Sequence, residues 1–180
     1  MLLCKRTFSF VLSLRYQNKK MLVEYTSLPE TAKVWIFPSN RKFYDTEIEG
    51  LNQKITSFLE SWNADDATFQ VSYKLMYNRF IVLFATSENP LTNLVIDASV
   101  SFILQLQQAY DIELLDKMNV CFKQGKYVQY KDLKEFKKLL KNRAVTRKSI
   151  VFDNLVTTKE EFENYWEVPI SESWYGRFLK

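Results

Sequence analysis

The chain has 180 residues, of which 47% are hydrophobic and 16% aromatic, with only three glycines and four prolines. This is enough material for one domain with a buried core and too little for two, and the composition excludes a disordered or low-complexity chain. The formal net charge of +4 is concentrated at the start, because residues 1–20 hold five Lys or Arg and no acid, whereas residues 21–180 hold 20 basic and 21 acidic residues. The net charge therefore gives no reason to expect that the whole domain binds nucleic acid or a membrane.

The first 20 residues, MLLCKRTFSFVLSLRYQNKK, permit three interpretations: an over-extended start, a targeting segment or a surface arm. The apolar run FSFVLSL is too short for a membrane helix, and no small-residue cleavage site follows it. We favour an over-extended start, with residues 1–20 as an extension or a disordered arm and residues 21–180 as a single α+β domain. Residues 21–180 contain no targeting signal and no membrane span, so we expect a cytoplasmic protein that does not associate with membranes.

The first elements follow from hydrophobic periodicity. AKVWIF, residues 32–37, is a short run of β-forming residues that Pro38 stops, so it predicts a strand. Apolar residues then recur at intervals of three and four, which predicts a helix with one buried face; they are Ile48, Leu51, Ile55, Phe58, Leu59 and Trp62. The alternation that begins at Phe69 and the dense run FIVLF, residues 80–84, predict two antiparallel strands joined at residues 77–79.

The second half of the chain contains further predicted helices and strands. Residues 97–110 predict a helix with Asp97 as its N-cap, and residues 119–130 predict a strand pair that turns at Gln124–Gly125. Residues 131–143 form an amphipathic helical pattern with lysines on one face, and residues 149–152 predict a further strand. Thr158 and Glu161 have the spacing of a capping box, which predicts a short last helix before Pro169.

These elements predict an α+β fold in which helices cover an antiparallel sheet. The order strand, helix, strand, strand, helix, strand through residue 124 is that of the split βαβ unit, so a ferredoxin-like core is the preferred topology. The additional hairpin and the C-terminal helices would then be appendages to that core.

Missing residue types exclude several kinds of chemistry. The chain has no histidine, which removes Ser-His-Asp and Cys-His arrangements and histidine zinc sites. Its only glycines are Gly50, Gly125 and Gly176, so no glycine-rich phosphate loop can be written. The only cysteines are Cys4 and Cys121, and we expect Cys121 to be a small buried hydrophobe. No cofactor is therefore expected.

Polar clusters beside the apolar elements are the candidate ligand contacts. Asn40 and Arg41 follow the first strand, and Asn78 and Arg79 lie at the first hairpin, where they could bind an anion. The alternative is that these residues only form turns, with Asn78 in a left-handed conformation. Asp97, Asp116 and Asp153 stand at element boundaries and could bind Mg²⁺ if they converge, although their spacing matches no metal motif.

The basic run from Lys131 to Lys148 holds eight Lys or Arg against two acids, and its Lys137 and Lys138 are candidate phosphate contacts. A solvated helix face with i,i+3 and i,i+4 ion pairs is the simpler interpretation. The choice between them depends on whether the cations gather on one surface.

Several ordered blocks of the sequence resemble a known family: AKVWIFPSNRKF, YNRFIVL, IDASVSFI, LLDKMNVCFKQGKY, IVFDNLV and NYWEVPISESWYGRF. Between about residue 21 and the C-terminus, they resemble an uncharacterised family of small bacterial proteins that some genome pipelines label "ABC transporter ATPase". The resemblance implies a natural start near Met21, and it implies no activity. We reject the ATPase label because the phosphate-binding loop that it requires is missing.

Two functional hypotheses remain. The preferred one is a non-catalytic module that binds a protein partner or itself through its polar-aromatic tail, with Trp166, Trp174, Tyr175 and Arg177 as interface candidates. A tail that simply docks onto the core is the alternative interpretation of the same residues. The second hypothesis is a protein that binds nucleic acid or a phosphorylated ligand, extending to a metal-dependent phosphoesterase.

Overall fold

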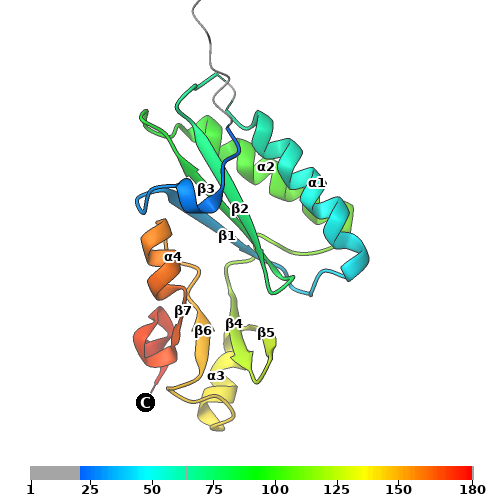
Figure 1. Ribbon diagram of the computed structural model, residues 1–180. Coiled ribbons are helices and arrows are strands. Elements are labelled where there is room, and N and C mark those ends of the chain that lie inside the picture. The colour runs from blue at the N-terminus through cyan, green and yellow to red at the C-terminus, as the bar shows by residue number, and fades with distance from the viewer. Residues whose placement is uncertain (1–20, 64, 180) are drawn as a thin grey trace, which may run out of the picture.

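The computed structural model describes residues 21–63 and 65–179, which form two antiparallel sheets and four α-helices (Figure 1). The predicted extension, residues 1–20, lies outside the described residues. The elements are β1 Lys33–Pro38, α1 Asp45–Ser61, β2 Gln70–Met76, β3 Phe80–Thr86, α2 Asn93–Tyr110, β4 Asn119–Gln124, β5 Tyr127–Asp132, α3 Leu133–Lys141, β6 Ile150–Phe152, α4 Lys159–Tyr165 and β7 Glu167–Pro169. Short 3₁₀ turns are η1 Tyr25–Ser27, η2 Ile170–Glu172 and η3 Trp174–Phe178. The predicted α+β class is confirmed.

The first sheet has the order β1-β3-β2, and both neighbouring pairs are antiparallel. β1 and β2 therefore run in the same direction on either side of β3, which is the split βαβ arrangement that the element order predicted. Residues 80–85 of β3 are buried on both faces, as expected for a dense apolar run in a central strand.

The fourth strand departs from the ferredoxin-like prediction. β4 lies in a second sheet of order β5-β4-β6-β7 instead of pairing with β1. Beside β1, the backbone N–H of Val34 donates to the carbonyl oxygen of Thr157 at 3.0 Å, and that of Lys159 donates to Ala32 at 2.9 Å. β4 instead makes the local hairpin with β5, where Gly125 takes the positive φ of 60° that the turn needs.

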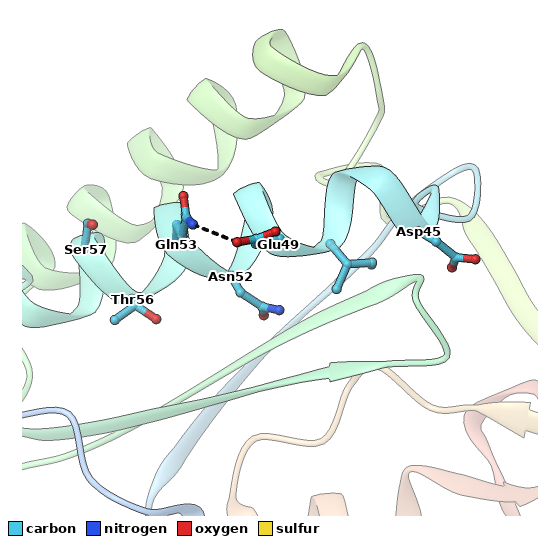
Figure 2. Close-up of a pocket in the computed structure, with 7 residues that line it drawn as sticks. Asp45, Glu49, Asn52, Gln53, Thr56 and Ser57 are labelled. Carbon is cyan, nitrogen blue, oxygen red and sulfur yellow. Dashed lines mark hydrogen bonds between the residues drawn. The ribbon is translucent and has the colours of Figure 1, made fainter.

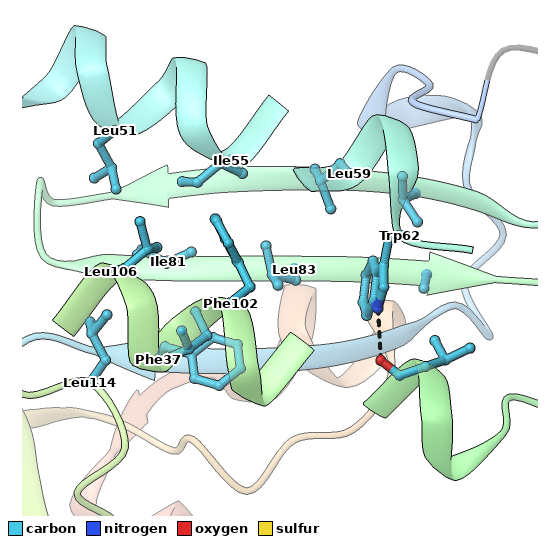
Figure 3. Close-up of a cluster of buried hydrophobic side chains, with 14 of the residues drawn as sticks. Phe37, Leu51, Ile55, Leu59, Trp62, Ile81, Leu83, Phe102, Leu106 and Leu114 are labelled. Carbon is cyan, nitrogen blue, oxygen red and sulfur yellow. Dashed lines mark hydrogen bonds between the residues drawn. The ribbon is translucent and has the colours of Figure 1, made fainter. Parts of the chain in front are cut away.

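Helices α1 and α2 cover one face of the first sheet and enclose the largest apolar core (Figure 3). Leu51, Ile55 and Leu59 of α1 are fully buried, as their spacing predicted. Trp62 is also buried, and its indole Nε1–H donates to the carbonyl oxygen of Val95 at 2.7 Å. This bond fixes the end of α1 against the start of α2.

A second core connects the opposite face of the first sheet to the second sheet and to α4. Phe80 of β3 packs against both Phe152 and Trp166, with ring centroids 4.7 Å and 5.1 Å away. A third core, built around Phe122, Phe136 and Ile170, packs α3 and the C-terminal turns on the other face of the second sheet. Each buried side chain of this size contributes about 1.5–3 kcal/mol.

The start of α2 corrects the sequence prediction. The helix begins at Asn93 with Thr92 as its N-cap, so Asp97 is an exposed residue of the second turn and not the cap. Tertiary packing explains the earlier start, because Val95 is buried and accepts the Trp62 indole bond. The capping box at α4 is confirmed, since Thr158 Oγ accepts the Glu161 N–H at 3.2 Å and Glu161 Oε2 accepts the Thr158 N–H at 3.3 Å.

Candidate functional site

The loop after β1 uses its polar side chains for internal bonds. Arg41 forms a bidentate pair with Glu47 at 2.9 Å and 2.8 Å and also donates to the carbonyl oxygen of Tyr110 at 2.7 Å. Asn40 and Glu113 exchange two bonds, at 3.1 Å between backbone groups and at 3.2 Å from the Glu113 N–H to Asn40 Oδ1. These two candidate anion contacts thus hold the loop to α1 and to the segment after α2.

The hairpin tip between β2 and β3 is also engaged within the fold. Tyr77 and Asn78 both have positive φ, 56° and 47°, so the predicted left-handed conformation of Asn78 is confirmed. Arg79 Nη1 donates to the carbonyl oxygens of Ser39 and Asn40 at 2.9 Å and 3.1 Å. Burial lowers the pKa of Arg79. The structure does not bring Arg79 and Arg41 together on an open surface of cations, because Arg79 is held by carbonyl groups of the loop after β1 and Arg41 is held by Glu47 and the end of α2.

The three aspartates that could bind Mg²⁺ if they converged do not form a metal site. Among the described residues, no three His, Cys, Asp or Glu side chains are placed to hold a metal ion. Asp97 is exposed on α2, Asp116 accepts the Met118 N–H at 2.7 Å, and Asp153 accepts the Trp174 N–H at 2.9 Å. These three aspartates therefore do not converge, because they lie on different parts of the fold.

Cys121 is buried in the second core, and burial raises the pKa of its thiol to about 12. The prediction that it is a small buried hydrophobe is confirmed. A thiol with such a pKa is not a nucleophile at neutral pH.

Trp166 is not a surface residue, which corrects its assignment to the interface. Only 2% of it is exposed, its ring stacks on Phe162 at 4.7 Å, and its Nε1–H donates to Asn154 Oδ1 at 2.9 Å. Tyr175 packs its ring 5.6 Å from Phe136, and burial raises the pKa of the Tyr175 hydroxyl. Both residues therefore hold the C-terminal segment on the core.

The remaining tail residues meet the basic helix. Trp174 is 37% exposed, and the Arg177 guanidinium lies over its ring at 4.3 Å. The centroid of the Phe178 ring is 5.3 Å from that of Trp174, and the Lys137 ammonium lies 4.1 Å from the Phe178 ring centroid. Lys138 and Lys141 are further exposed lysines of α3. We call the following set of residues the α3–tail surface: Lys137, Lys138, Lys141, Trp174, Arg177 and Phe178.

The α3–tail surface lies within a strongly basic part of the chain. Residues 117–148, from the end of the α2–β4 loop through α3, hold 11 Lys or Arg against two acids. The rest of the described domain is acidic, since residues 21–116 hold six basic and 13 acidic residues. Lys131 pairs with Glu135 at 3.3 Å, and no other ion pair forms on α3 in the described part of the chain. Most of these cations are thus not neutralised.

Sequence reasoning missed a shallow groove beside α1. Its volume is about 630 Å³, and its lining residues are Asp45, Ile48, Glu49, Asn52, Gln53, Thr56 and Ser57. Figure 2 shows Asn52 and Thr56 pointing from α1 toward the sheet, and Asn52 Oδ1 accepts the Tyr73 hydroxyl of β2 at 3.1 Å. The groove therefore runs above the edge strand β2. Periodicity predicted α1 and β2 but not which strand lies beside α1, so only the polar residues of α1 gave a signal.

Within the described residues, no helix is both long enough and apolar enough to cross a bilayer. The chain matches no family model, no curated protein and no solved structure.

Proposed function

We propose that this chain is a non-catalytic cytoplasmic binding module and that its α3–tail surface engages an acidic surface of a partner protein. The observation that carries the proposal is the continuity of unneutralised cations with a half-exposed Trp–Arg pair on one surface. The absence of histidine and of a phosphate loop from the sequence supports a module without catalysis.

The residue types of the α3–tail surface suit a protein partner. Trp and Arg are enriched among the residues that carry binding energy at interfaces, and Trp174 and Arg177 already stack at 4.3 Å. An aromatic ring that is held by the fold loses little conformational entropy on binding. Lys137 and Lys138 would attract acidic groups and raise the rate of encounter.

Nucleic acid is the second candidate partner. The excess of nine positive charges within residues 117–148 favours it, because phosphate contacts depend on such cations. Most aromatic rings beside α3 are packed in the third core, which leaves few platforms for stacked bases. We therefore rank an acidic protein first.

The family resemblance stays a proposal and adds no activity to this assignment. It would place the chain in a family of small bacterial proteins. An ATPase activity is not proposed, because the sequence has no glycine-rich phosphate loop.

Affinity capture with the tagged full chain tests the proposal. Wild type is compared with the double variant Lys137→Glu and Lys138→Glu in nuclease-treated lysate of the native host. We expect an acidic protein to be retained by wild type at moderate salt and lost by the double variant, because two attractive contacts become repulsive.

The matched control is the double variant Lys42→Glu and Lys54→Glu; both lysines are exposed and lie outside the α3–tail surface. This control has the same change of net charge and should retain the partner. If the Lys137 and Lys138 variant retains the same proteins as wild type, the proposal is wrong. Capture that occurs from untreated lysate and is lost after nuclease treatment would favour the nucleic-acid candidate.

A further inference from the structure

The outer edge of β2 is only partly paired. Its backbone groups bond to Met21 and Val23 at Val71, and the groups after Val71 make no further bond to the described residues. Val71 accepts the Val23 N–H and donates to the Met21 carbonyl oxygen, both at 2.9 Å, so its backbone points away from β3. Alternate residues of a strand direct their backbone groups to the same side, so the N–H and C=O groups of Tyr73 and Leu75 also point away from β3. Neither makes a further backbone bond to the described residues. This part of the edge can accept another strand.

The groove above this edge is acidic. Asp45 and Glu49 line it, and no Lys or Arg does. Both carboxylates are exposed, and the Asn78 side chain reaches Asp45 only at a long 3.4 Å. A strand that adds to β2 would bring its neighbouring side chains under these carboxylates, so the groove favours a basic strand.

The basic segment of residues 117–148 contains a strand with a free edge. β5 is the outer strand of the second sheet and joins β4 through the turn between Gln124 and Tyr127. The pair that flanks such a turn is hydrogen-bonded, so Val128 and Tyr130 direct their backbone groups away from β4. Neither forms another backbone bond to the described residues. Lys126 and Lys131 flank this stretch, and Lys126 is exposed.

We propose that β5 of a second copy of this chain adds to the free edge of β2 beneath the acidic α1 groove. The surroundings of the two edges differ in charge, because Asp45 and Glu49 line the groove above β2, whereas Lys126 and Lys131 flank β5 within residues 117–148, which carry a net charge of +9. The isolated bridge that Leu22 makes with Val71 shows that this edge accepts backbone pairing. The interface uses no residue of the α3–tail surface, so it is independent of the proposed function.

This pairing is heterologous, because each copy offers one acceptor edge and one donor strand. Head-to-tail contacts of this kind grow into longer assemblies unless they close into a ring. A small edge contact gives weak affinity, and salt screens its charge attraction. The assembly should therefore grow with protein concentration and shrink as salt is raised.

Sedimentation velocity of the full chain over a concentration series measures this association directly. At low salt we expect the sedimentation coefficient to rise with concentration, and at high salt we expect a monomer. Asp45→Asn combined with Glu49→Lys should weaken the association by about tenfold or more, because the groove loses both negative charges. The matched control, Glu60→Lys with Glu88→Gln, makes the same change of net charge at exposed residues outside the groove and should associate like wild type.

The donor strand is blocked by Val128→Pro, which removes an outward N–H without removing a β4–β5 bond. Val128→Ala loses a similar side chain but keeps the N–H, so it should still associate. Circular dichroism and thermal melting of each variant verify that it folds.

Mixing the two defective proteins gives the decisive result. The groove variant retains a working β5 and the Val128→Pro variant retains a working groove, so together they should form a one-to-one dimer although each alone is monomeric. A mixture that stays monomeric overturns the proposal. It is equally overturned if wild type is monomeric at every concentration and low salt, or if both variants still associate alone.

Discussion

At the scale of single residues, two tryptophans of the C-terminal segment have opposite roles that their sequence context does not reveal. Trp166 and Trp174 both lie in the polar-aromatic stretch NYWEVPISESWYGRF. Trp166 is 2% exposed and Trp174 is 37% exposed, because the tail folds back so that only part of it faces the core. The aromatic residues of the tail are visible in the sequence, but the burial of Trp166 depends on its contacts with Phe80 of β3, Phe152 of β6 and Phe162 of α4.

Replacing Trp166 with alanine should be strongly destabilising. The ring contacts Phe80, Phe152 and Phe162 in the core that connects the two sheets. A large aromatic lost from such a site costs about 3–5 kcal/mol. Urea unfolding measures this loss, and an unchanged unfolding midpoint would show that the ring is not part of the core.

Asp66 gives a prediction on pH. Its carboxylate accepts hydrogen bonds from Ser87 Oγ at 2.6 Å and from Thr68 Oγ1 at 2.7 Å and Thr68 N–H at 2.8 Å, and these bonds lower the pKa of Asp66. The stabilisation is therefore present above the unfolded-state pKa of about 3.9 and is lost as pH falls toward the folded-state value.

Asp66→Asn should be less stable than wild type at neutral pH, and the difference should shrink below about pH 4 as the wild-type carboxylate protonates. Chemical unfolding at a series of pH values tests this. A difference that stays constant down to the acid limit would mean that the carboxylate charge is not what these donors stabilise.

At the scale of elements, periodicity identified the helices and the long strands because their buried faces repeat in sequence. α1, both hairpins and α4 are found where their apolar residues and caps predicted. Partnering between strands was harder to predict. The pairing of β4 with β6, and the three-residue strand β7, depend on contacts between distant segments that leave no periodic signal. The start of α2 moved to Asn93 for the same reason, since the buried Val95 is fixed by Trp62.

The capping box of α4 supports a prediction at this scale. Thr158→Ala removes the hydroxyl that accepts the Glu161 N–H and should cost about 1 kcal/mol of stability. Thr158→Ser keeps the hydroxyl and should stay close to wild type. Thermal melting compares the two, and equal losses for alanine and serine would attribute the effect to the lost methyl group and not to the cap.

At the scale of the whole molecule, charge is separated along the fold. The part that contains α1 and α2 is acidic, and the part that contains β4, β5 and α3 is basic, although residues 21–180 together carry a net charge of only −1. Residue counts over the whole domain hide this separation. Lys137 and Lys138 were predicted as one site and Trp174 and Arg177 as another, and the fold joins them because η3 packs beside α3. Asn40, Arg41 and Arg79 could not be assigned from sequence, since their partners come from segments far along the chain.

The most direct test of the central claim is to measure Trp174→Ala in two assays, unfolding stability and affinity for the captured partner. Trp174 is partly exposed and its ring contacts mainly Tyr175, Arg177 and Phe178 within its own turn. We expect stability to fall by no more than about 1 kcal/mol and affinity to fall tenfold or more, about 1.4 kcal/mol. A large loss of stability with unchanged affinity would contradict the account, because Trp174 would then only dock the tail onto the core.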